Sequence, residues 1–218
     1  EHGKPDAAFE SPHQLIEATF YAPYLAHATM EPMTATAAVH KDGRVEVWVP
    51  TQNASASLET AARTAGVDPL QVEVHNTQLG GGFGRRGANQ DFTGQAVRIA
   101  KAVGRPVKLF WSREEDTQHD FYRPASMARL RAAVNGKGQL TGMQARIAAP
   151  SILTTLGMKA ADGSDPVALQ GIADQFYSVT NNRADYALRT LHVTDGFWRS
   201  VNHSHKTSFR EHFLDPVA

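Results

Sequence analysis

The chain has 218 residues, 41% of them hydrophobic and 20% charged, a globular composition with room for one large or two small domains. Its 22 basic and 22 acidic residues give a net charge of zero, so no global field attracts nucleic acid or an anionic membrane. No stretch has the length of a transmembrane helix, and the first residues lack the basic and apolar regions of a signal peptide. Cysteine is absent, which excludes disulfides, thiolate zinc sites, catalytic thiols and cysteine-held iron–sulfur clusters from these residues. Its absence leaves the compartment open between the cytoplasm and a periplasmic or membrane-associated location.

Residues 1–14 are polar and contain two prolines, so we expect a polar lead-in to a segment that covers residues 15–218. Alternating apolar residues predict strands at residues 15–21, 34–40, 44–50, 72–77, 106–111, 127–134, 140–148 and 188–193. Asp42-Gly43 is a strong signal for a tight hairpin between the second and third of these strands.

Helical spacing of apolar residues predicts helices at residues 54–65, 92–103 and 204–214, and a short one near 167–173. Asn53 and Gly66 are the expected N-cap and terminating glycine of the first helix. Hairpins mixed with helices favour an α+β fold, a two-layer α/β sandwich with a mixed sheet, over a purely parallel sheet. A loop-rich stretch suggests an approximate subdivision near residue 150.

The most informative motif is a glycine loop, residues 80–84, which read Gly-Gly-Gly-Phe-Gly and precede Arg85 and Arg86. Glycine permits positive φ and lets a ligand approach the backbone, and arginine offers a planar charge suited to phosphate oxygens. A flexible linker is less favoured, because linkers are mixtures of glycine and serine. The loop matches neither the dinucleotide fingerprint nor the P-loop, so it indicates a different ligand.

Three other groups of side chains could carry chemistry. Gln52 ends a predicted strand near the glycine loop, and its amide can both donate and accept, although simple solvent exposure is the commoner role of glutamine. Residues 197–200, Phe-Trp-Arg-Ser, suit a planar anionic ligand as well as they suit ordinary packing. His27 and Glu31 are four residues apart, but Pro32 limits a helix there, so we expect a tight turn with a structural His–Glu contact rather than a metal pair.

The remaining histidines and serines give weaker signals. His203, His205 and His212 lack a carboxylate pattern, so satisfied or exposed histidines are favoured over a metal site. No serine falls in a nucleophile elbow, so a Ser-His-Asp triad is not indicated.

Motifs along nearly the whole chain resemble the molybdenum hydroxylase family, the superfamily of xanthine dehydrogenase and aldehyde oxidase. The resemblance is greatest to the large, molybdopterin-binding subunits of isoquinoline 1-oxidoreductase type and to related membrane-associated bacterial aldehyde dehydrogenases. It rests, in sequence order, on residues 24–32, 49–53, 80–86, 106–109, 112–116, 119–125 and 196–201.

The resemblance implies a molybdopterin cofactor with molybdenum, with molybdopterin cytosine dinucleotide as the expected form. The implied cofactor-binding residues are Gln52, Gly81, Gly82, Phe83, Gly84, Arg85, Trp198, Arg199 and Ser200. Gln52 would hydrogen-bond an oxygen ligand of the molybdenum without binding the metal itself, and the backbone of Gly82 and Phe83 would reach the metal's ligands. Such enzymes hydroxylate an electron-poor carbon with water as the oxygen source and pass two electrons onward.

Two departures from the family pattern qualify this expectation. The family's general-base glutamate, in a Gly-Glu context, has no counterpart here, so no catalytic residue is expected in this chain and the chain alone should be inactive. After Phe83 the chain reads Gly-Arg-Arg-Gly where xanthine dehydrogenases have Gly-Gly-Lys-Glu, which disfavours a purine substrate. An N-heteroaromatic substrate of isoquinoline type is favoured, with aldehyde oxidation and a non-catalytic anion-binding or assembly domain as alternatives.

The resemblance also implies partners. Enzymes of this type export electrons through iron–sulfur clusters, and this chain has no cysteine to hold them, so the resemblance implies a separate small subunit with [2Fe-2S] clusters. The rest of the large subunit is a further expected partner, a cytochrome c electron acceptor stays open, and the substrate would be a small aromatic molecule or an aldehyde.

Overall fold

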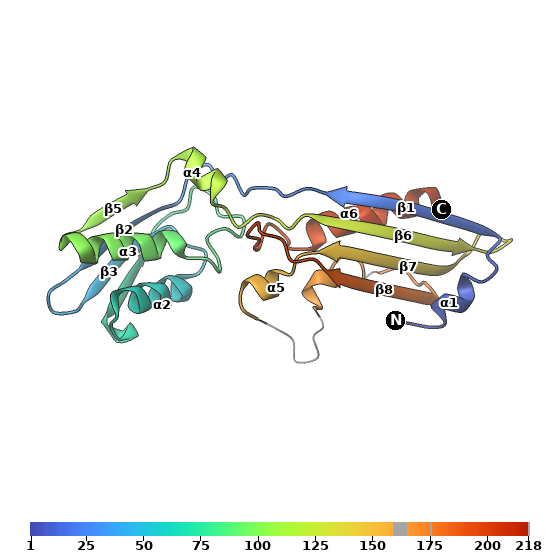
Figure 1. The fold of residues 1–218 in the computed structure, drawn as a ribbon, viewed down its shortest axis with the longest axis horizontal. Helices are drawn as coiled ribbons and strands as arrows, with labels where there is room; N and C mark the ends of the chain where they lie inside the picture. The colour runs from blue at the N-terminus through green and yellow to red at the C-terminus, as the bar shows by residue number, and fades with distance from the viewer. Residues whose placement is uncertain (159–164, 175, 218) are drawn as a thin grey trace. The chain divides into compact units, whose positions relative to one another are not determined.

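The computed structural model describes residues 1–158, 165–174 and 176–217. The chain divides into two compact units, one made of Glu1–Leu25 with Arg123–Ala218 and the other of Ala26–Tyr122 (Figure 1). Each unit contains one four-stranded sheet and its own hydrophobic cluster. Within the described residues, no helix is both long enough and apolar enough to span a bilayer.

The unit Ala26–Tyr122 has a mixed sheet in the order β4-β3-β2-β5. Its strands are β2 (Thr34–Val39), β3 (Val45–Val49), β4 (Val72–Asn76) and β5 (Val107–Phe110). β2 is antiparallel to β3 and to β5, whereas β3 and β4 run parallel. The parallel pair needs a crossover connection, which α2 (Ala54–Ala65) and the short η1 (Pro69–Gln71) supply.

One face of this sheet packs against α2 and α3 (Asp91–Val103). Alternate residues of β3, Val45, Val47 and Val49, are fully buried on that side. The predicted caps of α2 are confirmed: Asn53 Oδ1 accepts from Ala56 N at 3.0 Å, and Gly66 takes φ 76°. A short helix, α4 (Arg113–Gln118), follows β5.

The other unit has a mixed sheet in the order β1-β6-β7-β8. Its strands are β1 (Gln14–Ala22), β6 (Ser126–Val134), β7 (Leu140–Ala149) and β8 (Asn181–Leu188), and only β7 and β8 are parallel neighbours. Its helices are α1 (Pro5–Ala8), α5 (Ile152–Thr155) and α6 (His203–Leu214), with 3-10 turns η2 (Val167–Leu169) and η3 (Asp215–Val217). Phe209 and Phe213 of α6 pack into the hydrophobic cluster of this sheet.

The predicted α+β class with mixed sheets and hairpins is confirmed, and most predicted elements agree with the structure to within one or two residues. The strand predicted at 188–193 is wrong: β8 lies earlier, because Asn181–Leu188 pairs with β7 in parallel register as far as Leu188 opposite Ala149. Within the predicted lead-in 1–14, α1 forms and Pro5 is buried. Residue 150, the approximate subdivision, lies inside the unit that contains Arg123–Ala218.

Candidate functional site

The glycine loop lies between β4 and α3 and is attached to the end of β3 through Gln52. Gln52 Oε1 accepts hydrogen bonds from Gly84 N at 3.0 Å and from Arg86 N at 3.3 Å, and Gln52 N donates to Arg86 O at 3.0 Å. Backbone N–H groups only donate, so the side-chain oxygen must be the atom that faces the loop. The NH2 group is therefore on the opposite side of the amide, where it makes no hydrogen bond within the described part of the chain. Gln52 is exposed, so this donor is accessible to a ligand.

Close packing explains the glycines of the loop. A Cβ on Gly82 would lie 2.4 Å from Gln52 Oε1, and a Cβ on Gly80 would lie 2.4 Å from the Cβ of Glu31. Gly81 and Gly84 have φ of 99° and 109°, and Phe83 has φ 55°, a left-handed conformation that is costly for an aromatic residue. The loop is thus a tightly held backbone, not a flexible linker.

The two arginines after the loop are buried, which differs from the sequence expectation. The Arg85 guanidinium makes a two-point pair with Asp91, both distances 2.9 Å, and lies 3.1 Å from Asp120. The Arg86 guanidinium binds Gly81 O at 3.0 Å and the Glu31 carboxylate at 3.0 Å. Both side chains are 0% exposed, so their charges are neutralised inside the unit and are not offered to phosphate oxygens. Their contacts instead hold the glycine loop in place.

A buried hydrogen-bonded pair, His27 and Asp120, lies beside these arginines. His27 Nδ1 is 2.9 Å from Asp120 Oδ1, and His27 N donates to Asp120 Oδ2 at 2.6 Å. Burial alone raises the pKa of Asp120, but the His27 bonds and charge and the Arg85 guanidinium outweigh it and hold the pKa below its usual value. The predicted His27–Glu31 contact is wrong: His27 pairs with Asp120, whereas Glu31 accepts from Gly80 N at 3.1 Å and from Arg86.

The second predicted segment, with Trp198, Arg199 and Ser200, belongs to the other unit. The guanidinium of Arg199 lies 5.1 Å from the centre of the Trp198 ring, and that of Arg123 lies 5.3 Å from it. Ser200 has φ 38° and its neighbour Val201 φ 54°, two consecutive left-handed residues without a glycine. An aromatic ring with two guanidinium groups at a strained turn suits a planar anionic ligand.

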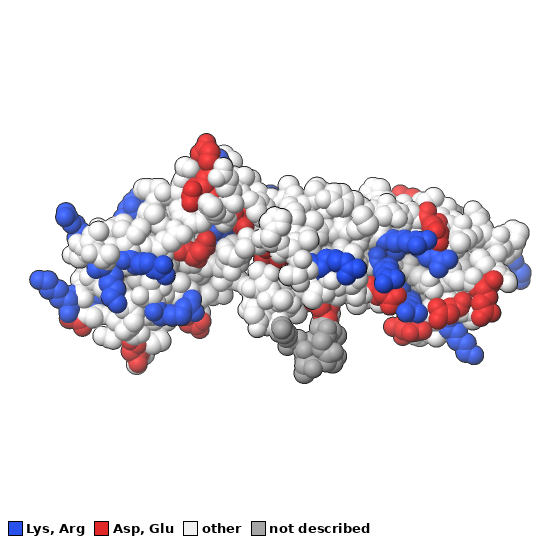
Figure 2. Space-filling view, viewed as in Figure 1, with Lys and Arg blue, Asp and Glu red and all other residues white. Residues whose placement is uncertain are grey.

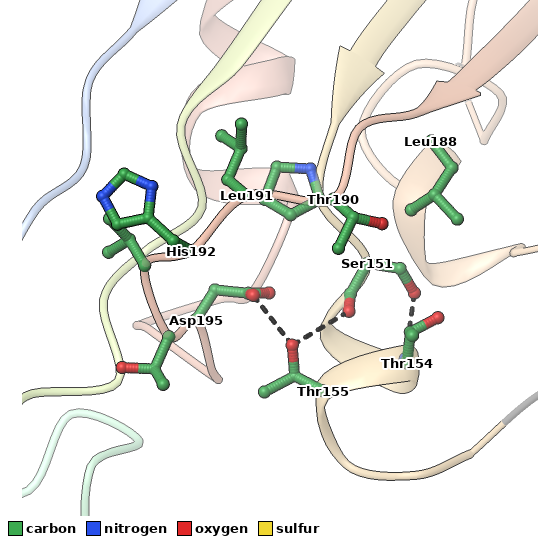
Figure 3. A pocket seen from close by; sticks show the side chains of 11 residues that line it. Ser151, Thr154, Thr155, Leu188, Thr190, Leu191, His192 and Asp195 are labelled. Atoms are coloured by element: carbon green, nitrogen blue, oxygen red, sulfur yellow. Dashed lines mark hydrogen bonds between the residues drawn. The ribbon is translucent and has the colours of Figure 1, made fainter.

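Asp195 anchors the chain just before this segment. Thr155 Oγ1, at the end of α5, donates to Asp195 Oδ1 at 2.8 Å, and Ser151 Oγ caps the same helix by accepting from Thr154 N at 3.1 Å (Figure 3). Asp195 is 3% exposed and burial raises its pKa, while Oδ2 has no hydrogen-bond partner among the described residues. Its surroundings form a cavity of about 150 Å³.

Of the histidines near the C-terminus, His203 and His212 have partners as expected, whereas His205 is buried and its Nε2 has no hydrogen-bond partner among the described residues. His203 Nε2 pairs with Asp174 at 2.6 Å, His212 Nδ1 lies 2.8 Å from Ser208 O, and His205 is buried. Burial first, then the charges of Lys206 and Arg123, lower the pKa of His205 to about 3. Over the described residues, the single group of three side chains placed to share a metal ion lies elsewhere, on β3 and β4.

The structure brings Gln52 against Gly82 and Gly84, whose loop also contains Gly81, Phe83 and Arg85, and holds Trp198 beside Arg199 and Ser200 in the other unit. The sequence did not reveal the carboxylates that position these segments, Glu31, Asp120 and Asp195. Each of them pairs with a residue far away in sequence: Glu31 with Gly80 at a separation of 49, Asp120 with His27 at a separation of 93, and Asp195 with Thr155 at a separation of 40. Only a sign of burial in the sequence, such as a carboxylate inside a run of apolar residues, could have indicated these three side chains.

The whole chain, residues 1–218, matches the family model of the molybdopterin cofactor-binding domain. The chain belongs to this family. Among curated relatives, the isoquinoline 1-oxidoreductase subunit beta of Brevundimonas diminuta is 37% identical over 157 residues, covering 70% of this chain and 19% of the relative. A membrane-bound aldehyde dehydrogenase [pyrroloquinoline-quinone] of Gluconacetobacter polyoxogenes is 34% identical over 225 residues, covering 98% of this chain and 28% of the relative.

Solved structures share the fold of this molybdopterin cofactor-binding domain. Quinoline 2-oxidoreductase from Pseudomonas putida 86 superposes with a TM-score of 0.79 at 18% identity, covering 100% of this chain and 28% of that chain. The aldehyde oxidoreductase from Desulfovibrio gigas superposes with a TM-score of 0.79 at 20% identity, covering 99% of this chain and 24% of that chain. The resemblance to molybdenum hydroxylases is therefore confirmed, and the chain spans less than a third of the length of these relatives.

Proposed function

We propose that this domain is part of the large subunit of a molybdenum hydroxylase that hydroxylates an N-heteroaromatic ring of isoquinoline type with water as the oxygen source. The observation that carries the proposal is the orientation of Gln52. Its Oε1 is occupied by two loop amides, so its NH2 group is a fixed donor for an oxygen atom outside the loop. The 37% identity to an isoquinoline 1-oxidoreductase subunit supports the ring substrate.

The residues of the chain fit a molybdenum cofactor. Gln52 would donate to an oxygen ligand of the metal without binding the metal itself. The Gly81–Gly82–Phe83–Gly84 backbone, kept free of Cβ atoms where it meets Gln52, would lie against the cofactor, and Arg85 would act from inside by holding the loop. The cofactor, when bound, supplies the oxygen transfer and takes up two electrons.

We also propose cofactor contacts for three residues of the segment Arg123–Ala218. Trp198, Arg199 and Ser200 present a ring, a guanidinium and a hydroxyl from a strained turn, a combination suited to the pterin or to its phosphates. We infer molybdopterin cytosine dinucleotide as the nucleotide form.

The remaining components would come from outside this chain. The rest of the large subunit would supply the general-base glutamate, so the 218-residue chain alone should be inactive. A small subunit with [2Fe-2S] clusters would receive the electrons, and a cytochrome c would be a further acceptor.

The substitution Gln52→Glu tests the role of Gln52. Glutamate keeps an oxygen for the Gly84 and Arg86 amides but removes the NH2 donor, so kcat should fall about 100-fold with the fold unchanged. The full-length protein would be purified with its small subunit after molybdenum-replete expression, and kcat, molybdenum content and thermal unfolding would be measured. Gln95→Glu is the matched control, because Gln95 Oε1 is also a hydrogen-bond acceptor, from Trp111 Nε1 at 2.9 Å, and Gln95 lies outside the glycine loop. An unchanged kcat in Gln52→Glu would remove Gln52 from the mechanism.

Aldehyde oxidation by the same site is the second candidate, because an aldehyde dehydrogenase is 34% identical over 98% of the chain. Product analysis in ¹⁸O-labelled water, with isoquinoline-type rings and with aldehydes, separates the two. If the purified complex contains no molybdenum or pterin under molybdenum-replete expression, both fail and a non-catalytic assembly domain is the remaining interpretation.

A further inference from the structure

The face of the β4-β3-β2-β5 sheet that lies away from α2 and α3 carries a group of metal-binding side chains from neighbouring strands. Glu46 of β3 is in register with Glu73 of β4, and Trp48 is in register with His75. Since alternate residues share a face, these four side chains lie on the side opposite the buried Val45 and its equivalents. None of them takes part in the molybdopterin site described above.

The distances within this group suit one bound ion. His75 Nε2 is 3.5 Å from Glu46 Oε1 and 3.8 Å from Glu73 Oε1, and the three ligand atoms all lie within 4.8 Å of one another. Around a tetrahedral Zn²⁺, with metal–ligand distances near 2.1 Å, neighbouring ligand atoms are about 3.4 Å apart. Small rotations of the Glu46 and Glu73 side chains would bring the three ligand atoms to the separations that a bound Zn²⁺ requires.

Other side chains already orient these ligands. The Trp48 ring stacks on His75 with centroids 4.8 Å apart and an interplanar angle of 13°, which restrains the imidazole. His40 Nε2 lies 2.7 Å from Glu46 Oε2, so the other carboxylate oxygen faces His75. Hydrogen bonds of this kind to a ligating carboxylate are typical of metal sites, where they fix the ligand orientation.

The ring nitrogen at the centre is poorly satisfied. His75 Nε2 is shielded from solvent, and its nearest carboxylate oxygens, Glu46 Oε1 at 3.5 Å and Glu73 Oε1 at 3.8 Å, lie at or beyond the limit of a hydrogen bond. A shielded polar atom with such long contacts costs free energy that a bound ion would recover. Arg44 Nη1 lies 3.6 Å from Glu46 Oε2 and, within the described residues, is the one arginine or lysine that pairs with these carboxylates; its side chain is 54% exposed and able to turn away.

We propose that Glu46, Glu73 and His75 form a binding site for a divalent transition metal, Zn²⁺ by preference, with water as the fourth ligand. One imidazole and two carboxylates are a mixed nitrogen and oxygen set, which suits Zn²⁺ better than Ca²⁺ or Mg²⁺, since those ions take oxygen ligands. The proposed zinc site uses none of the proposed cofactor-binding residues, so its test does not depend on the proposed oxidoreductase function.

The test uses the full-length protein and its variants Glu73→Gln and His75→Gln. Zn²⁺ binding is measured by competition with a chromogenic chelator, and carbethoxylation of each histidine, with and without Zn²⁺, is followed by mass spectrometry. Removing either ligand should weaken the zinc affinity about tenfold or more, and Zn²⁺ should protect His75 from labelling. Mg²⁺ at the same concentration should give no protection.

His119→Gln is the matched control, because His119 also lies near one glutamate, Glu115, at 3.4 Å, but has no third ligand. This variant should bind zinc as the wild type does, and Zn²⁺ should leave His119 labelling unchanged. Glu73 is 60% exposed, so Glu73→Gln should keep the fold. This variant therefore tests the site even if His75→Gln fails to fold. Equal labelling of His75 with and without Zn²⁺, or equal zinc affinity in all variants, would show a plain ion-pair network and overturn the proposal.

Discussion

At the scale of single residues, the candidate site depends on which way one amide faces. Gln52 offers an oxygen and an NH2 group, and two backbone N–H groups, of Gly84 and Arg86, select the oxygen. The choice leaves a donor at the surface of the loop. This orientation requires that residue 82 has no side chain, because a Cβ there would lie 2.4 Å from Gln52 Oε1.

The substitution Gly82→Ala should break this arrangement. The new Cβ would meet Gln52 Oε1 at 2.4 Å and displace the side chain, and Gly82 is not at a positive φ, so the effect is steric. We expect faster hydrogen exchange at the amides of Gly84 and Arg86 and a loss of about 1–3 kcal/mol of unfolding free energy. Gly136→Ala is the control, since its Cβ would come no closer than 3.8 Å to the atoms around it. Unchanged exchange at Gly84 would contradict the proposed contact.

At the scale of secondary-structure elements, the sequence pattern predicts the helix α6 but not the burial of two of its polar side chains. The apolar residues of His203–Leu214 indicate a helix, but the structure also buries the polar side chains of His205 and Lys206. Lys206 Nζ is satisfied by Asn202 Oδ1 at 2.8 Å and by Ala168 O. Burial lowers the pKa of Lys206 to about 8.

The buried His205 predicts an acid-sensitive stability. Its folded pKa of about 3 lies below the ordinary value of 6.5, so the unfolded chain binds more protons between these two pH values. Stability should therefore fall as the pH falls from about 6.5 toward about 3. In His205→Gln this slope should be smaller, as measured by chemical unfolding of the full-length protein across that range. A variant with the wild-type slope would show that His205 is not responsible.

The β8 strand shows where element prediction fails for a physical reason. Both 181–188 and 188–193 contain residues compatible with a strand, and short runs carry little information about pairing. β7 decides between them, because it offers a free edge over Gly142–Ala149 that pairs with Asn181–Leu188. Residues 188 and 190–195 then line the cavity beside Asp195.

At the scale of the whole molecule, the chain builds two hydrophobic clusters that share no residue. One includes Met33, Phe92 and Trp111, and the other includes Leu130 and Phe213. On the face drawn in Figure 2, basic and acidic side chains are interspersed, in agreement with the zero net charge. Two separate clusters imply that damage to one unit can be confined to it.

The substitution Asp120→Asn tests this confinement. It breaks the buried His27–Asp120–Arg85 group and should cost about 3–5 kcal/mol. Because the folded pKa of Asp120 is depressed, its stabilisation is present above the unfolded pKa and is lost as pH falls through the folded value. Hydrogen exchange should accelerate in residues 26–122 and not in the other unit.

The exposed pair Glu115–His119 provides the control for that measurement. Glu115→Gln should change stability by less than about 0.5 kcal/mol, because both side chains are more than half exposed. Equal acceleration of exchange in both units of Asp120→Asn would show that the units do not unfold separately.

The sequence alone determined the features that depend on local chemistry: the caps Asn53 and Gly66, the periodic faces of α2 and α3, the hairpins, the α+β class, and the family resemblance carried by the glycine loop and Gln52. These follow from neighbours within a few residues, which every conformation of the chain retains. Only the tertiary structure decided that Arg85 and Arg86 face inward, that His27 pairs with Asp120, that β8 begins at Asn181, and that Glu46, Glu73 and His75 meet on one face. Those outcomes depend on desolvation and pairing between segments far apart in sequence, which no local pattern records.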